Sequence, residues 1–255
     1  MNDNASARSA ASDQSDGAAP SAPSDPLAPA FAALKVYDRG AARAALLPID
    51  EATAAASAGD SPARPQLEER LVAALESGGS VVAREYICAR LALVGSARCV
   101  NALVASLAET EVATAARRAL EALPCPEAGA ALRASLATLN GLAKVGVINS
   151  LGHRRDTGSV EALSALLREP EPQIARAAAA ALGRVGSAQA GEALAAFLAQ
   201  APVEQRRAAA DAVLRCAEAL WAAGRRAEAQ GLCRKLLEPG QSAWVQEAAR
   251  RKASG

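Results

Sequence analysis

A motif of about thirty residues recurs through the middle of the chain and constrains the fold more than any other feature. Its reference copy has an anchor leucine, Leu182, followed by Leu194 and Leu198, and the same frame recurs at Leu91, Leu120 and Leu151. Successive anchors are therefore 29, 31 and 31 residues apart. A unit of this length holds two short helices and cannot bury its own apolar stripe, so it must stack on its neighbours. The repeat predicts a solenoid of helix pairs.

Each copy follows the same order along the chain. A helix is followed by a turn at Gly-Ser or Pro, a second helix and a polar break such as the Glu-Pro-Glu-Pro run at 169–172. Leucines four residues apart place an apolar stripe on the second helix, and runs of alanine allow the first helices to pack closely. A fifth copy anchored at Leu220 fits if its first helix is about seven residues longer.

Composition supports the same fold class. Half of the residues (51%) are apolar, but only 2% are aromatic, so an aromatic-rich sandwich or barrel core is excluded. The abundant alanine and leucine are strong helix formers. The chain is predicted to be all-α.

Changes in composition divide the chain into four parts. Residues 1–24 are rich in Ser, Asp, Ala, Pro and Gly without apolar periodicity, which predicts a disordered polar tail. Residues 25–79 hold three expected helices that form an N-terminal cap, the first starting at Asp25-Pro26 and the second spanning about 41–57. Residues 80–200 hold four repeats, at about 80–109, 110–138, 139–169 and 170–200. Residues 201–255 hold the divergent fifth repeat, part of which resembles a tetratricopeptide unit, and a C-terminal cap.

The repeat units also carry a family resemblance. The string IARAAAAALGRVGSAQAGEALAAFL at 174–198 resembles the HEAT-like repeat of the phycobilisome-lyase type. The stretches at 33–52, 84–103 and 144–156 resemble a group of bacterial HEAT-repeat proteins frequent in planctomycetes and verrucomicrobia. The resemblance covers about residues 27–237 and implies a right-handed α-α superhelical solenoid of HEAT-like, armadillo-type helix pairs. It implies almost nothing about activity.

Charge and segment composition exclude several classes of protein. The net charge of +1 offers no whole-chain attraction for nucleic acid or an anionic membrane. No apolar stretch is long enough for a membrane span, and no signal peptide is readable, so a cytoplasmic location is expected, although proteins of the resembled group are often exported. The five cysteines are odd in number and form no CxxC pair, which predicts buried thiols and neither a disulfide framework nor a zinc cluster.

Motifs for catalysis and cofactors are also missing from the sequence. The iron site of the HEAT-like deoxyhypusine hydroxylases is built from repeated His-Glu pairs, whereas this chain has one histidine, His153. No phosphate-binding loop, nucleophile elbow or HExxH string is present. We therefore expect no cofactor, no metal and no catalytic residue.

The remaining candidate is a binding surface. Exposed positions of the first helices, which in the resembled repeats line the concave groove, hold Glu85, Tyr86, Arg118, Asn149, His153, Arg176, Arg184, Arg215 and Glu218. Tyr86 fits equally well with packing against the N-terminal cap. The arginines fit a solvated helix face, and His153 fits an inter-helix turn.

These positions lead to one main hypothesis and two alternatives. The main hypothesis is a non-catalytic scaffold that holds a protein or peptide along its concave groove. The first alternative is a bilin lyase of the resembled type. The second is a nucleic-acid-binding solenoid, for which residues 201–255 carry 10 Lys or Arg against 6 Asp or Glu but lack aromatic stacking platforms.

Overall fold

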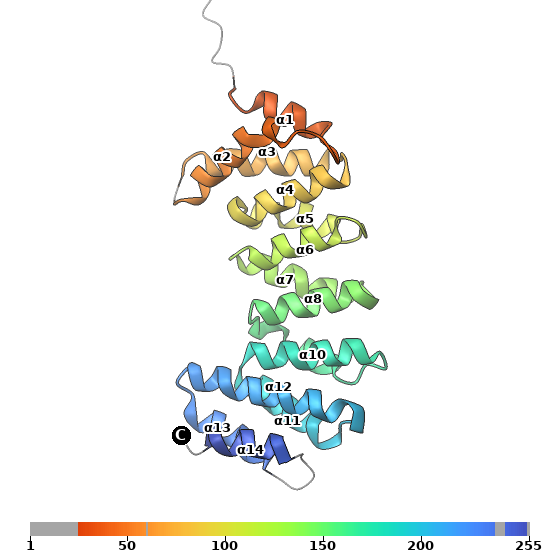
Figure 1. The fold of residues 1–255 in the computed structure, drawn as a ribbon, viewed down its shortest axis with the longest axis vertical. Coiled ribbons are helices and arrows are strands. Elements are labelled where there is room, and N and C mark those ends of the chain that lie inside the picture. Colours follow the sequence, from red (N-terminus) through yellow and green to blue (C-terminus); the bar gives the residue numbers. More distant parts are fainter. Residues whose placement is uncertain (1–24, 60, 238–242, 254–255) are drawn as a thin grey trace, which may run out of the picture.

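The computed structural model describes residues 25–59, 61–237 and 243–253. Over these ranges the chain forms fourteen α-helices and three 3-10 helices, without a strand. The helices follow one another along the long axis of an elongated molecule (Figure 1). This confirms the all-α solenoid that the repeat predicts, while the expected tail at 1–24 lies outside the described residues.

Five helix pairs form the body of the solenoid. They are α4 (Val81–Val94) with α5 (Val100–Ser106), α6 (Ala113–Ala122) with α7 (Pro126–Ser135), α8 (Gly141–His153) with α9 (Val160–Leu166), α10 (Pro172–Val185) with α11 (Ala188–Gln200), and α12 (Val203–Ala222) with α13 (Arg226–Leu236). The first helices of successive pairs contact one another in one layer, which faces the viewer in Figure 1. The second helices form the layer behind.

Further helices lie at the two ends of the stack. At the N-terminal end, α1 (Ala28–Lys35), α2 (Leu47–Ser57) and α3 (Arg64–Glu76) precede the first pair, and α2 and α3 both contact α4. At the other end, α14 (Ala243–Ala253) packs on α12 and α13. Each terminal pair of the body is therefore covered by helices from outside the repeat.

Two helix starts differ from the predicted ones. The first helix was expected at Asp25-Pro26, but it begins at Ala28, because a carboxylate oxygen of Asp25 accepts the N–H of Leu27 at 3.0 Å and forms a turn first. The expected helix at 41–57 begins as a 3-10 turn, Arg43–Leu46, before α2. Pro48 explains this. An α-helix accepts proline only in its first turn, so α2 cannot start much earlier than Leu47.

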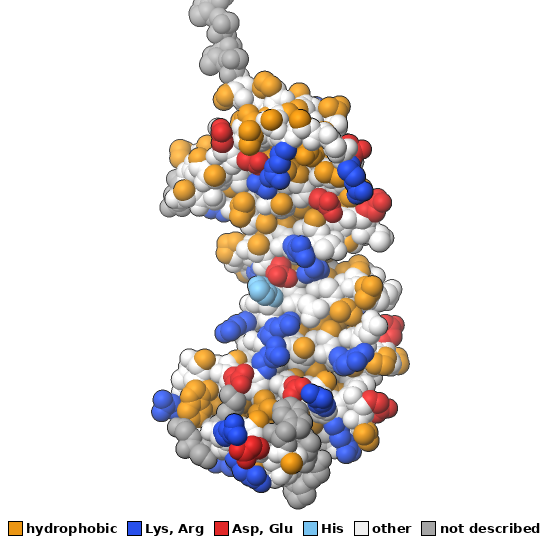
Figure 2. All heavy atoms as spheres, in the orientation of Figure 1, with side chains coloured by type: hydrophobic (Ala, Val, Ile, Leu, Met, Phe, Trp, Pro, Cys, Tyr) orange, Lys and Arg blue, Asp and Glu red, His pale blue; other side chains and the backbone are white. Residues whose placement is uncertain are grey.

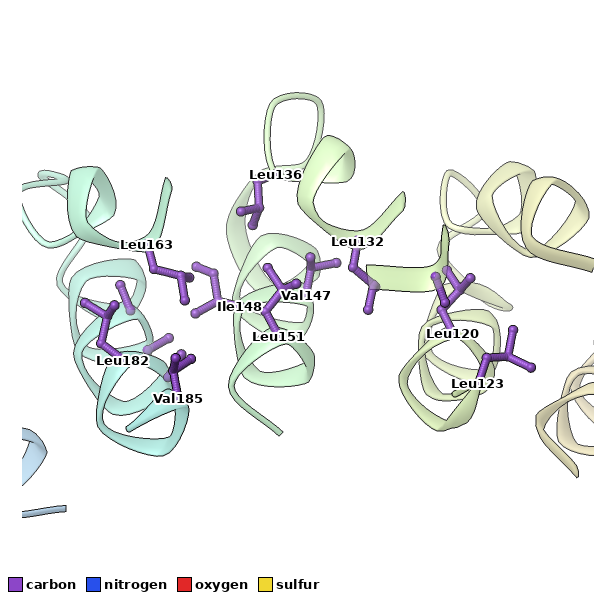
Figure 3. Close-up of a cluster of buried hydrophobic side chains, with 14 of the residues drawn as sticks. Leu120, Leu123, Leu132, Leu136, Val147, Ile148, Leu151, Leu163, Leu182 and Val185 are labelled. Atoms are coloured by element: carbon purple, nitrogen blue, oxygen red, sulfur yellow. The ribbon is translucent and has the colours of Figure 1, made fainter. Parts of the chain in front are cut away.

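The core lies between the two layers and is made by the repeated leucines. All five anchor leucines are fully buried: Leu91, Leu120, Leu151, Leu182 and Leu220. The leucines of the second helices are also buried, and Figure 3 shows Leu132, Leu136 and Leu163 facing the layer of first helices that holds the anchors Leu120, Leu151 and Leu182. Burying each such side chain stabilises the fold by about 1.5–3 kcal/mol.

The fifth pair departs from the others in the predicted way. Its first helix, α12, has 20 residues, against 14 in α4 and in α10. None of the helices in the described ranges has both the length and the apolar character needed to cross a membrane.

The first helices of the last three pairs, α8, α10 and α12, pack closely against one another at glycine residues. A Cβ placed on Gly152 of α8 would lie 2.7 Å from the Cα of Ala181 in α10. A Cβ on Gly183 of α10 would lie 2.8 Å from the carbonyl oxygen of Ala212 in α12. Small residues on both sides therefore set the short distance between these helices.

An arginine links the second and third pairs. Arg154, directly after α8, donates from its guanidinium to the carbonyl oxygens of Leu120 and Glu121 at 2.9 and 3.0 Å, and also to those of Leu123 and Cys125. The last carbonyls of a helix have no partner within the helix. Arg154 thus supplies the missing donors for the C-terminal end of α6.

Candidate functional site

The structure gathers four of the nine predicted groove residues around one surface hollow. The arginine hollow, as we call it, has a volume of about 400 Å³ and lies over the C-terminal halves of α8, α10 and α12. Its lining consists of Gly152, His153, Arg155, Gly183, Arg184, Arg215, Glu218, Ala219 and Ala222. Figure 2 shows blue side chains gathered below the pale blue of the histidine. Three helix pairs therefore contribute to one cationic site.

Four of the other predicted residues lie outside the arginine hollow. Glu85 on α4, Arg118 on α6 and Arg176 on α10 are exposed, and the guanidinium of Arg176 donates to the carbonyl of Pro172 at 3.1 Å. Asn149 is half-buried in α8. These side chains follow the helical spacing, but the structure does not bring them together.

Tyr86 corrects the predicted groove. Only 8% of its surface is exposed, because α2 of the N-terminal end covers it. Its hydroxyl donates to Asp50 at 2.7 Å, and the guanidinium of Arg90 lies 4.8 Å from the ring centre and 2.9 Å from Asp50. Burial, and then the hydrogen bond to Asp50, raise the pKa of the Tyr86 phenol. Tyr86 therefore joins α4 to α2 and is not available to a ligand.

A polar network lies beside the arginine hollow, between α6 and α8. The buried Ser150 hydroxyl donates to Glu121 at 2.5 Å and accepts from Arg117 at 2.6 Å. Arg117 and Glu121 also form an ion pair at 3.2 Å, and the His153 imidazole lies 3.9 Å from the other Glu121 oxygen. Because Ser150 is bonded to Glu121 and not to His153, this arrangement links helices and does not activate the hydroxyl as a nucleophile.

Sequence reasoning missed Arg155, which has an unusual backbone conformation. Its φ is 50°, and it is the one residue other than glycine with a positive φ in the described ranges. The N–H of Arg155 bonds to Gly152 and that of Asp156 to Leu151, which is the Schellman ending of a helix. In the fourth and fifth pairs the position four residues after the anchor is Gly186 and Gly224, both with positive φ. The signal was an arginine where the next two repeats have glycine.

The strain at Arg155 leads to a stability prediction. The left-handed conformation costs a residue with a Cβ roughly 1–2 kcal/mol, whereas glycine adopts it freely but loses more backbone entropy on folding. We expect Arg155→Gly to raise the free energy of unfolding by about 1 kcal/mol. Urea denaturation followed by circular dichroism measures this, and a less stable variant would show that the Arg155 side chain contributes more to folding than its backbone costs.

A second hollow adjoins the first. Its volume is about 410 Å³, and its lining, from α12, α13 and α14, consists of Ala217, Glu218, Trp221, Ala222, Ala229, Cys233 and Arg251. Glu218 and Ala222 line both hollows, so the two form a continuous surface. The half-buried Trp221 ring lies under Arg226, whose guanidinium carbon is 5.2 Å from the ring centre. The second hollow is the more apolar of the two.

The thiols are poorly suited to nucleophilic chemistry. Burial raises the pKa of Cys88 and Cys99 to about 12 and that of Cys216 to about 11, and Cys233 is also buried. The reactive species is the thiolate, which is then scarce at neutral pH. Within the described residues, no three His, Cys, Asp or Glu side chains are grouped so that they could hold a metal ion.

This difference among the cysteines can be measured. Cys125, in the turn between α6 and α7, is half-buried and the other four are buried. We expect a thiol reagent at pH 8 to modify Cys125 first and the others only as the chain unfolds. Peptide mapping of the labelled protein checks the order, and Cys125→Ser should remove the fast phase. Fast labelling of Cys88 or Cys216 in the native protein would contradict the assignment.

Comparison with known proteins agrees with the architecture. Residues 140–215 match the family model of HEAT repeats, a section that includes all three arginines of the hollow. No curated protein matches the chain.

Similar solved structures include natural and engineered proteins. One engineered protein is 23% identical, with a TM-score of 0.42 over 73% of this chain and 94% of its own. A chain in the structure of the complex of CpcE and CpcF of phycocyanin lyase from Nostoc sp. PCC7120 is 22% identical, with a TM-score of 0.42 over 93% of this chain and 97% of its own. A second engineered protein is 20% identical, with a TM-score of 0.41 over 88% and 67%. Similarity at this level says nothing about activity. From the stacked helix pairs and the match at 140–215, the chain is an α-solenoid that carries HEAT repeats.

Proposed function

We propose that the chain is a non-catalytic binding protein that holds a protein or peptide on the surface formed by the two adjoining hollows. The observation that carries the proposal is the arginine hollow, where side chains from three successive helix pairs meet. Four of them, His153, Arg184, Arg215 and Glu218, occupy first-helix positions of the kind with which repeat proteins bind their partners. Arg184 is half-buried and the other three are exposed.

The shape of this surface supports an extended partner. The cationic hollow continues through Glu218 and Ala222 into the apolar hollow beside Trp221. A peptide presents charged and apolar side chains along its length, and such a surface can contact both kinds at once.

Selection from a random peptide library tests the proposal. The wild-type chain is compared with Arg184→Glu/Arg215→Glu, which reverses two charges in the arginine hollow. The matched control is Arg98→Glu/Arg234→Glu, which makes the same change in net charge at two exposed positions outside the lining of either hollow. We expect the wild type and the control to enrich the same peptides and the hollow variant to lose them. If no peptide is enriched, the proposed function is wrong; if all three chains enrich the same peptides, the binding surface lies elsewhere.

A further inference from the structure

We infer that the arginine hollow recognises an oxyanion, and that the partner is an acidic peptide whose carboxylate or phosphate group binds Arg155, Arg184 and Arg215. This inference rests on the proposed function and specifies the chemistry of its partner. A carboxylate and a phosphate each present a pair of oxygens, and the guanidinium group of arginine can bind such a pair with two parallel hydrogen bonds.

The charge of the lining favours an anion. Three guanidiniums face one carboxylate, that of Glu218. Among the residues that the structure describes, Arg155, Arg184 and Arg215 form neither an ion pair nor a side-chain hydrogen bond. Like charges held around one hollow repel one another, so an anion that binds between them gains from all three.

Neighbouring arginines behave differently. Arg154 donates to the carbonyls at the end of α6, and Arg117 pairs with Glu121 and Ser150. Arg133 donates to both oxygens of Asp156 at 2.7 Å. Arginines beside the hollow are therefore bound within the protein, while those in its lining are left for a ligand.

The backbone at Arg155 is an independent observation. The chain has an arginine at a left-handed position where the next two helix pairs have Gly186 and Gly224. Nothing in the helix ending requires this side chain, because its hydrogen bonds come from the backbone. Strained residues of this kind are concentrated at binding sites, where the strained backbone holds the side chain in the position that contacts the ligand. The side chain of Arg155 lines the arginine hollow.

The rest of the lining suits a peptide better than a nucleic acid. Ala219 and Ala222 have small side chains and are not buried, so a ligand can approach the surface of α12 between the arginines. The lining includes no Phe, Tyr or Trp on which a base could stack, and the His153 imidazole is its one aromatic ring. Base stacking is a main source of affinity for single strands.

Fluorescence anisotropy with labelled probes tests the inference on the full chain. The probes are hexaglutamate, a phosphoserine peptide of equal length, hexaglutamine, and a single-stranded oligodeoxynucleotide of matched charge. We expect one or both anionic peptides to bind, less tightly as ionic strength rises, and hexaglutamine not to bind. The ratio of the two anionic affinities shows whether carboxylate or phosphate is the natural group.

Variants locate the bound group. Arg184→Gln and Arg215→Gln should each weaken anionic binding about tenfold, because each removes a charge-assisted hydrogen bond. Arg155→Gly should also weaken it while raising the melting temperature, which separates binding from folding. Glu218→Gln should tighten it, and Arg98→Gln/Arg234→Gln should leave it unchanged.

Each contrary outcome has its own meaning. If neutral peptides selected from the library bind the hollow and anionic ones bind no better, the oxyanion inference is wrong and the proposed function stands. If no peptide of either kind binds, both are wrong. An oligonucleotide that binds more tightly than the peptides through the same arginines would overturn the choice of partner. If Arg155→Gly, Arg184→Gln and Arg215→Gln bound the anionic peptides as tightly as the wild type does, the choice of site would be overturned.

Discussion

Leu194→Asp is expected to destabilise the protein by about 4 kcal/mol or more. Leu194 is fully buried in α11, which packs against α9, α12 and α13. Removing a buried leucine costs about 2–5 kcal/mol, and an unpaired carboxylate in the same space adds a desolvation penalty. The free energy of unfolding is measured by urea titration with far-ultraviolet circular dichroism.

The control for this variant lies two residues further along the same helix. Ala196 is exposed, so Ala196→Asp introduces the same side chain into water. It should cost less than about 1 kcal/mol, the difference in helix propensity. Similar unfolding midpoints for the two variants would contradict the place of Leu194 in the apolar stripe.

The second large effect is expected at Gly152. Replacing a helical glycine with alanine normally stabilises a helix by up to about 1 kcal/mol. Here the new Cβ would lie 2.7 Å from the Cα of Ala181, which belongs to the backbone of α10 and cannot rotate away. Overpacking of this kind costs about 1–3 kcal/mol and forces the two helices apart. We expect Gly152→Ala to lose about 2 kcal/mol of unfolding free energy.

Gly231 provides the matched test. It lies within α13, and a Cβ placed on it would have no atom within 4 Å. Gly231→Ala should therefore gain up to about 1 kcal/mol in the same urea titration. Opposite signs for the two glycine substitutions are the expected result. If Gly152→Ala were as stable as Gly231→Ala, α8 and α10 would not be in close contact.

The fold was predictable because its signal is periodic. The anchor leucines recur at a nearly constant interval, and every one of them is buried. Local breaks in this regularity were harder to predict. The 3-10 turn before α2 depends on a single proline, Pro48, and the start of α1 depends on the side chain of Asp25 closing a turn.

The candidate site was predictable only where it follows the helical periodicity of the repeats. Helical spacing predicted His153, Arg184 and Arg215 as groove residues, and all three line the arginine hollow. It could not show that α2 covers Tyr86, since Asp50 lies 36 residues earlier in the chain. It also could not show that Arg155 has a left-handed backbone, because that conformation follows from how α8 ends.

The three arginines of the hollow are on three different helix pairs, because Arg155 follows α8, Arg184 is on α10 and Arg215 is on α12. In a solenoid each helix pair contacts only its neighbours, so small rotations between successive pairs add up to a bend of the whole stack. Bending would change the spacing of the three guanidiniums, and a ligand that spans them would resist it. Occupation of the arginine hollow would therefore stiffen the C-terminal half of the molecule, and mechanical strain applied at its ends would alter the affinity.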